Sequence, residues 1–173
     1  MITLRPFRED ELGYFDVVDP TADPYNFFGF RLAGGPTARW RENGLVDHLD
    51  GGTLAVALDD VLVGDVQWHP VRYGPPGVVP PAFNIGITLL TAQRGKGYGS
   101  TAQRLLGDHL FAVYAVHRLE ASTDVSNIAE QRALAKAGFT REGILRGAQF
   151  RAGRYRDLVQ FSRLRDDNPD AAG

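Results

Sequence analysis

The sequence predicts a mixed α/β domain with a mostly antiparallel central sheet and helices on both of its faces. Three observations lead to this prediction. Segments that favour strands occur both before and after the segments with helical periodicity, instead of alternating regularly with them. Two pairs of these strand segments are joined by turn-forming residues, which predicts antiparallel hairpins. A glycine-rich turn connects one strand to the longest amphipathic helix.

Length and composition restrict the classes of protein to consider. The 173 residues suffice for one domain with its own core, expected over residues 1–165 and followed by a loose tail, residues 166–173. A formal net charge of −2 gives no field that would hold nucleic acid. The absence of cysteine from the sequence excludes disulfides and thiol nucleophiles. No stretch approaches the roughly 20 apolar residues that span a bilayer, so we expect a cytoplasmic protein without a membrane partner.

The first part of the chain predicts a strand, an irregular region and a helix. Residues 2–5 alternate as a short strand, and the acidic residues 9–11 suit the first turn of a helix. Residues 19–36 hold three prolines and four aromatic residues, so we expect an irregular segment that serves core packing or a substrate pocket. A helix is expected over residues 37–48.

The middle of the chain predicts the centre of the sheet. Residues 53–58 and 61–69 flank a two-aspartate turn and predict a hairpin. Residues 70–81 hold half of the prolines and predict a stiff, non-helical connection. Residues 83–90 are apolar on both faces, as in a central strand. Residues 97–114 place apolar side chains at helical spacing and predict an amphipathic helix on the sheet.

The last part of the chain predicts a strand, a helix and a closing hairpin. Residues 118–122 favour a strand. A helix is expected to begin at Asn127 and to stop at Gly138, because glycine suits the left-handed cap position. Residues 139–145 and 155–164 then predict two antiparallel strands joined by a turn that contains arginine and glycine.

The segment 93–99 is predicted to hold phosphate. Its sequence, Gln-Arg-Gly-Lys-Gly-Tyr-Gly, places three glycines and two cations at the start of a helix. Glycines let the backbone approach an anion closely, while free N–H groups and about half a positive charge of helix dipole point at the anion. A turn that only changes the chain direction needs neither feature. The predicted phosphate-binding residues are Arg94, Gly95, Lys96, Gly97, Tyr98 and Gly99.

The glycines alone leave two kinds of phosphate ligand open. Residues 97–102 match the dinucleotide pattern G-x-G-x-x-A, and Glu120 lies near the distance at which an acid would hold a ribose, so a dinucleotide-dependent oxidoreductase is one alternative. Such a fold places the pattern after its first strand and repeats strand-helix units afterwards. Here three predicted strands precede the strand that leads into the pattern, and a hairpin closes the chain, which disfavours that alternative.

Two blocks of the sequence resemble the GNAT acetyltransferase superfamily. Residues 94–99 resemble its Q/R-x-x-G-x-G/A motif. Asn127, residues 134–139 and residues 142–146 are similar to the N…L-x-K-x-G-F-x-x-E-G-x-L-R run of the RimJ/RimL-like branch, which acetylates protein N-termini and other amines. The resemblance extends over roughly residues 2–165.

The resemblance implies an N-acetyltransferase that moves an acetyl group from acetyl-CoA to a primary amine by direct attack in a ternary complex. The implied sheet has about seven strands, and residues 83–90 and 118–122 splay apart to admit the pantetheine arm. Leu89 and Leu90 would offer backbone groups to this arm, Asn127 would contact it, and the glycine loop would bind the diphosphate. The implied acceptor is a peptide N-terminus or a small-molecule amine, and a homodimer stays open.

The catalytic residues are less well defined by the sequence. The amine must lose a proton, and Glu120, on a strand expected to border the cofactor cleft, is the candidate base. The alternative is that Glu120 is an ion-paired strand carboxylate, with Arg118 or Arg146 as its partner. Asp65 and His69 share one face of a neighbouring strand and are weaker candidates. The four histidines show no ligand spacing, so no metal site is predicted.

The sequence departs from the resembled family at three positions. Asn84 stands where many relatives have a glutamate base, and Glu130 stands where they often have a serine that protonates the leaving thiolate. Leu134 stands where other branches have a tyrosine for the same role. A CoA-binding module with decayed catalysis is therefore a further alternative. For Glu130, an Asn-x-x-Glu capping box with Asn127 is favoured over a catalytic role.

Overall fold

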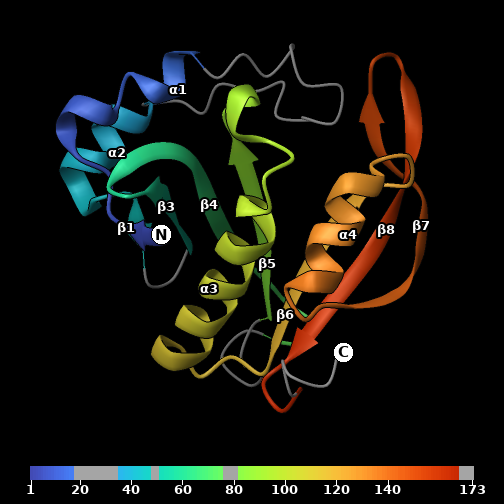
Figure 1. Cartoon of the computed structure of the whole chain (residues 1–173). Helices are drawn as coiled ribbons and strands as arrows, with labels where there is room; N and C mark the ends of the chain where they lie inside the picture. Colours follow the sequence, from blue (N-terminus) through green and yellow to red (C-terminus); the bar gives the residue numbers. More distant parts are fainter. Residues whose placement is uncertain (18–34, 48–50, 76–81, 168–173) are drawn as a thin grey trace.

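The computed structural model describes residues 1–17, 35–47, 51–75 and 82–167 (Figure 1). Most of the predicted irregular segment 19–36, and the end of the predicted tail, lie outside these residues. The elements are β1 (Ile2–Arg5), η1 (Glu9–Glu11), α1 (Tyr14–Val17), α2 (Gly35–Asn43), β2 (Val46–Asp47), β3 (Gly51–Leu58), β4 (Val61–Val71), β5 (Ala82–Leu89), η2 (Thr91–Gln93), α3 (Tyr98–Val113), β6 (Arg118–Asp124), α4 (Ile128–Lys136), β7 (Thr140–Arg151) and β8 (Arg154–Leu164).

The strands form one eight-stranded sheet in the order β1-β3-β4-β5-β6-β8-β7, with the short β2 paired to β3. Every described pair is antiparallel except β5 with β6, which are parallel. The prediction of a mixed, mostly antiparallel sheet is therefore confirmed. A single parallel pair at the centre does not fit a doubly wound dinucleotide-binding sheet, so the topology argues against the oxidoreductase alternative.

The end of the helix predicted over residues 37–48 was placed wrongly. Helix α2 stops at Asn43, because Gly44 and Leu45 both adopt left-handed conformations, with φ of 65° and 68°. Two consecutive residues in this region cannot continue a right-handed helix. The chain then enters β2 at Val46, a strand of two residues that is too short to leave a periodic signal.

The predicted connection over residues 70–81 also needs correction, because β4 continues through Pro70 to Val71. Pro70 pairs with Phe83 of β5, whereas the pairing of β4 with β3 ends at Trp68 and Gly52. Proline has no N–H to donate, and it is tolerated where a strand has no neighbour on that side. Residues 76–81 lie outside the described part of the chain.

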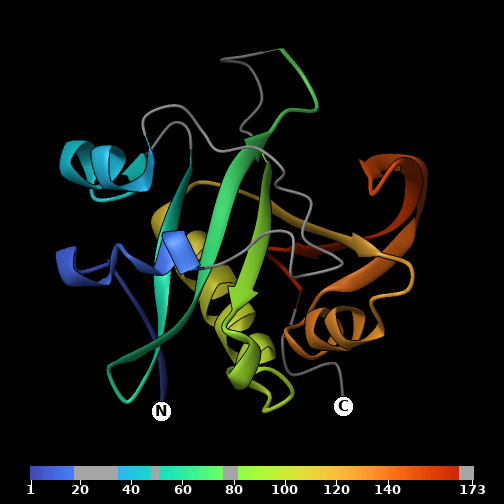
Figure 2. The same cartoon turned by 90° about the horizontal axis from the view of Figure 1, so that it is seen from above.

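Apolar clusters cover both faces of the sheet. Leu54 and Val56 of β3 face the main cluster, which includes Leu106 of α3 and Leu134 of α4. Ala55, which points to the opposite face, belongs to a second cluster formed with the N-terminal segment and partly with α2. Helices therefore lie on both faces, as predicted, and Figure 2 shows the sheet between them.

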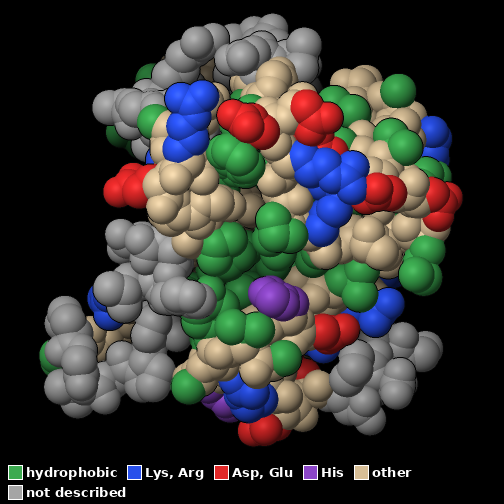
Figure 3. All heavy atoms as spheres, turned by 90° about the vertical axis from the view of Figure 1, so that its left-hand side faces the viewer, with side chains coloured by type: hydrophobic (Ala, Val, Ile, Leu, Met, Phe, Trp, Pro, Cys, Tyr) green, Lys and Arg blue, Asp and Glu red, His purple; other side chains and the backbone are tan. Residues whose placement is uncertain are grey.

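The surface carries charges of both signs. On the face drawn in Figure 3, Lys and Arg side chains are interspersed with Asp and Glu around a central group of apolar side chains. Within the described ranges, no helix has both the length and the apolar character needed to cross a membrane.

Gly64 of β4 lies opposite Leu89 of β5. A Cβ atom at Gly64 would lie 2.2 Å from the carbonyl oxygen of Thr88. We predict that Gly64→Ala lowers the free energy of unfolding by about 1–3 kcal/mol, because a backbone atom cannot move aside as a side chain can. Chemical denaturation measures this change. The control is Gly143→Ala in β7, where an added Cβ would meet no described atom within 4 Å; equal losses in both variants would contradict the prediction.

Candidate functional site

The two central strands separate over most of their length. β5 and β6 pair only where Phe83 meets Leu119 and Asn84 meets Glu120. β5 nevertheless stays paired with β4 as far as Leu89, and β6 stays paired with β8 as far as Asp124. Residues 85–89 and 121–124 therefore border a gap within an otherwise continuous sheet. The splay expected between these two strands is confirmed (Figure 1).

The hydrogen bonds between β4 and β5 use alternate residues of β5, and the remaining residues point their backbone groups into this gap. The N–H of Leu90 donates to the carbonyl of Val63, at 3.0 Å, and its own carbonyl accepts from the N–H of Gln93, at 2.8 Å. Since ladder bonds in an antiparallel pair involve alternate residues, Leu89 and Ile87 turn their backbone groups toward β6. Of the two predicted residues, Leu89 fits this geometry and Leu90 does not. The sequence interpretation did not name Ile87, whose backbone groups have the same orientation as those of Leu89, as the strand period indicates.

The predicted phosphate loop joins the open end of β5 to α3. Gly95 and Gly97 have φ of 74° and 83°, a region that favours glycine, and Gly97 is the N-cap of α3 without a side-chain cap among the described residues. The hydroxyl of Ser100 donates back to the Gly97 carbonyl, at 2.9 Å. The first N–H groups of α3 therefore have no capping acceptor in this part of the chain and can accept an anion.

The two cations of the loop have different surroundings. Arg94 Nε donates to the carbonyl of Leu89, at 3.0 Å, which ties the loop to the end of β5. Lys96 Nζ contacts Gln93 Oε1 at 3.1 Å and is exposed. Added Cβ atoms at Gly95 and Gly97 would meet no described atom within 4 Å, so the loop presents open space above its backbone.

Asn127 lies at the other side of the open end, after β6. Its Oδ1 accepts the N–H of Glu130, at 3.3 Å, and its Nδ2 donates to Thr123 Oγ1, at 3.1 Å. The predicted cap of α4 is therefore confirmed. The helix ends before Gly138, whose φ is 88°, also as predicted. The capping box favoured for Glu130 was a wrong prediction, because the Asn127 N–H donates to the carbonyl of Asp124, at 2.9 Å, and not to the Glu130 side chain.

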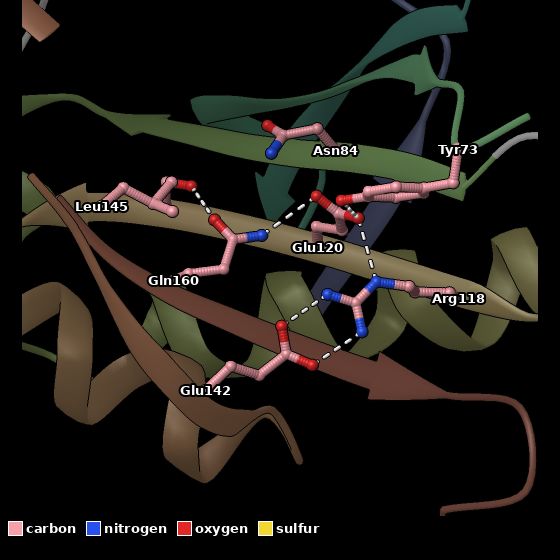
Figure 4. Close-up of a pocket in the computed structure, with 8 residues that line it drawn as sticks. Tyr73, Asn84, Arg118, Glu120, Glu142, Leu145 and Gln160 are labelled. Carbon is pink, nitrogen blue, oxygen red and sulfur yellow. Dashed lines mark hydrogen bonds and ion pairs between the residues drawn. The ribbon is translucent and has the colours of Figure 1, made fainter. Parts of the chain in front are cut away.

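A hollow of about 690 Å³ lies at the closed end of the gap, where β5 and β6 still pair (Figure 4). Its walls come from β5, β6, β7, β8 and the segment after β4. The lining residues are Tyr73, Asn84, Arg118, Glu120, Ser122, Glu142, Leu145 and Gln160. The gap therefore runs from the glycine loop to a polar hollow.

Glu120 is buried at the side of this hollow, with 4% of its surface exposed. Its Oε1 accepts from Arg118 Nε at 2.9 Å and from the Tyr73 hydroxyl, while its Oε2 accepts from Gln160 Nε2 at 3.0 Å. The ion pair with Arg118 is the alternative that the sequence left open for Glu120. Since a carboxylate has about four acceptor positions, Oε2 can still accept a further hydrogen bond.

Arg118 also holds a second carboxylate in the hollow. Its two terminal nitrogens donate to Glu142 at 2.7 Å and 2.5 Å, a bidentate arrangement, and Ser162 donates to the same carboxylate at 2.7 Å. The hydrogen bonds from Arg118 lower the pKa of Glu142 to about 2. Two carboxylates share one guanidinium, so the described walls of the hollow carry a net negative charge.

Polar residues of β4 continue the same face of the sheet. The register places His69 beside Asn84, which in turn pairs with Glu120. Burial lowers the pKa of His69, so its imidazole is neutral at pH 7.

Asp65 lies four residues earlier in β4 and is fully buried. It accepts a hydrogen bond from the Tyr14 hydroxyl at 2.8 Å, and burial raises its pKa to about 6. Asp65 lies opposite Thr88 and away from the hollow.

Comparison with known proteins identifies the family. Residues 1–140 match the family described as Acetyltransferase (GNAT) domain. The probable N-acetyltransferase YjcK of Bacillus subtilis is 40% identical over 93 residues, which are 54% of this chain and 49% of that protein. The uncharacterized N-acetyltransferase p20 of Bacillus licheniformis is 33% identical over 81 residues, 47% of this chain and 46% of that protein. The matches thus span about half the length of these two relatives.

Solved structures share the fold over nearly the whole chain. RimJ of Mycobacterium smegmatis, in complex with CoA-disulfide, has a TM-score of 0.74 at 22% identity and covers 99% of this chain and 85% of its own. Spermidine N-acetyltransferase of Vibrio cholerae, in complex with CoA and spermine, has a TM-score of 0.76 at 20% identity and covers 96% of both chains. With the match over residues 1–140, these observations show that the chain belongs to the GNAT acetyltransferase family.

Proposed function

We propose that the chain is an N-acetyltransferase that uses acetyl-CoA as donor and a primary amine as acceptor. The observation that supports this best is the separation of β5 from β6 between the glycine loop and the polar hollow. A cofactor with a phosphate end and a linear arm can lie along such a gap. The reactive end then reaches the hollow, where the acceptor would enter.

The residues around the gap fit acetyl-CoA. The uncapped start of α3 and the open backbone at Gly95 and Gly97 suit a diphosphate, and Lys96 adds an exposed cation. Leu89 and Ile87 would offer backbone groups to the amide-containing arm, as strands do when a peptide is added at a free edge. Asn127 stands at the opposite side of the open end and would contact the arm from there.

In the reaction proposed for this chain, the acceptor amine attacks the acetyl group of acetyl-CoA directly. Acetyl-CoA, when bound, supplies an activated acyl group, and the acceptor nitrogen must be neutral to attack it. We assign the acceptance of the amine proton to Glu120, through the free acceptor position of Oε2. Asn84 pairs with Glu120 across the two strands, and its amide can orient the acceptor but cannot take a proton.

The charge of the hollow selects the acceptor class. Glu120 and Glu142 outnumber Arg118, so the hollow attracts an ammonium group and disfavours an acidic substrate. An α-amine, with a reference pKa near 7.7, is partly neutral at pH 7, whereas a lysine side chain near 10.4 is almost wholly charged. A peptide N-terminus or a small amine therefore requires less of the base than lysine does. The solved Vibrio cholerae relative binds spermine, which carries positive charge, as an ammonium acceptor does.

The phosphate assignment can be tested with the two lysines of the chain. We predict that Lys96→Glu weakens the binding of CoA about tenfold, because a charge-assisted contact to the diphosphate is replaced by repulsion. Isothermal titration calorimetry at low and high salt measures this effect, which should shrink as salt increases. The matched control is Lys136→Glu, the only other lysine in the sequence, in the last turn of α4. Equal affinities of both variants would refute the assignment.

The role of Glu120 predicts a pH-dependent defect. We expect Glu120→Gln to reduce kcat/KM by about 100-fold at pH 6 and by much less at pH 9, where the amine is already neutral. Steady-state acetylation of one small amine across this pH range measures the difference. Glu142→Gln serves as the control, since it also breaks a contact of Arg118 and leaves the Glu120 carboxylate in place. A uniform loss over pH in Glu120→Gln would indicate a structural role only.

A further inference from the structure

The face of β8 that borders the hollow continues past it toward the turn of the β7–β8 hairpin. Side chains of a strand alternate between its two faces, so Arg156 and Leu158 share a face with Gln160, which lines the hollow. The register supports this placement, because Leu158 lies opposite Leu145, another lining residue. Beyond the pair of Asp124 with Leu158, β8 leaves β6 and continues only with β7 (Figure 1).

Among the described residues, Arg156 has no acidic partner. Its Nε is buried and lacks a hydrogen-bond partner, and its other nitrogens form no ion pair in the same part of the chain. Gln149, the residue opposite Arg156, uses its Oε1 to accept a hydrogen bond from Arg151, at 2.8 Å. A buried N–H group without a partner costs free energy, so proteins usually satisfy it. The guanidinium of Arg156 is therefore able to bind an anion that the described chain does not supply.

The neighbouring charges make this end of the face positive. Arg154 lies two residues before Arg156 and is exposed. Arg151 lies opposite Arg154, and its guanidinium contacts Asp124 at the end of β6. Asp157 is directed to the other face of β8, where it accepts a backbone N–H of β7, at 2.8 Å. The three arginines outnumber the carboxylate of Asp124, so the face changes from a net negative charge at the hollow to a net positive charge near the hairpin turn.

The distance between the two charged ends indicates the size of the acceptor. Arg156 lies four residues from Gln160, whose Nε2 donates to Glu120, so the two ends are separated by about 13 Å along β8. An extended peptide covers this distance with about four residues. Leu145 and Leu158 lie between the ends and offer an apolar surface to the residues of such a peptide. A small amine would occupy only the hollow.

We propose that Arg156 is a specificity-determining residue, which binds an acidic side chain at about the fourth position of a peptide acceptor. This inference rests on the proposed acetyl transfer. The amino terminus of the peptide lies beside Glu120 in the negative hollow, and the peptide runs along β8 toward the hairpin turn. Arginine suits this role, because its planar guanidinium binds a carboxylate through two parallel hydrogen bonds. The acceptor class is thereby narrowed to peptides with an acidic residue near the amino terminus.

A series of peptides tests the proposal on the unmodified protein. The peptides share one neutral sequence, in which a single aspartate is moved stepwise from the second to the seventh position, with alanine and lysine as replacements. We expect kcat/KM to be about tenfold higher with aspartate than with alanine near the fourth position, and lowest with lysine. The preference should shrink as salt increases, because the charges are then screened. Equal values for aspartate and alanine at every position would overturn the proposal.

Substitution of Arg156 assigns the preference to this residue. Arg156→Gln should acetylate the aspartate, alanine and lysine peptides at similar kcat/KM, and Arg156→Glu should prefer the lysine peptide, because the charge that it meets is reversed. The matched control is Arg132→Gln, which removes an exposed arginine from α4 and should keep the preference for aspartate. If the preference for aspartate persists in Arg156→Gln, the assignment is wrong.

Peptide binding without turnover separates this proposal from the proposed function. With CoA in place of acetyl-CoA, fluorescence anisotropy measures the dissociation constant of each peptide, labelled at its carboxyl end. The aspartate peptide should bind about tenfold more tightly than the alanine peptide to the wild type, and equally tightly to Arg156→Gln. This difference in a protein that acetylates no amine would support the acidic-peptide site and overturn the acetyl transfer. Acetylation of small amines by a protein that neither binds nor acetylates the peptides would overturn the peptide assignment alone.

Discussion

The limited pairing of β5 with β6 is the constraint on which the other features depend. Two residue pairs hold the halves of the sheet together, while each strand remains fully bonded on its outer side. Backbone groups that face the gap must find partners in water or in a ligand, because buried unpaired groups are costly. A parallel pair also places the starts of α3 and α4 at one edge. The gap, the glycine loop and the facing helix termini therefore follow from one feature of topology.

The closed end of the gap is held by polar groups around one buried carboxylate. A buried carboxylate such as Glu120 is tolerated only when it is paired and hydrogen-bonded. Arg118, Tyr73 and Gln160 meet this requirement from three separate segments. The same contacts fix the direction of Oε2, so the groups that make the burial possible also orient the candidate base.

The sequence predicted the fold well, because hairpins, helix periodicity and the glycine loop are local signals. Local patterns could not show that Leu45 would adopt a left-handed conformation, which ended α2 early. They also could not show which alternate residues of β5 face the gap. That choice follows from the hydrogen bond of the Leu90 N–H to the Val63 carbonyl, which directs Leu90 toward β4. The partners of Glu120 were mostly missed for a similar reason. Tyr73 and Gln160 are 47 and 40 residues away in the chain, and only the completed sheet brings them together.

The departure from the family at Asn84 has a different meaning in three dimensions than in the sequence. Read along the chain, the loss of a glutamate at this position supports a decayed enzyme. In the sheet, Asn84 pairs with Glu120, so a carboxylate lies one strand away on the same face. His69 flanks Asn84 on the other side and adds a neutral imidazole to this row. A proton acceptor therefore remains beside the position that lost one, and Asn84 is compatible with an active enzyme whose base is supplied by β6.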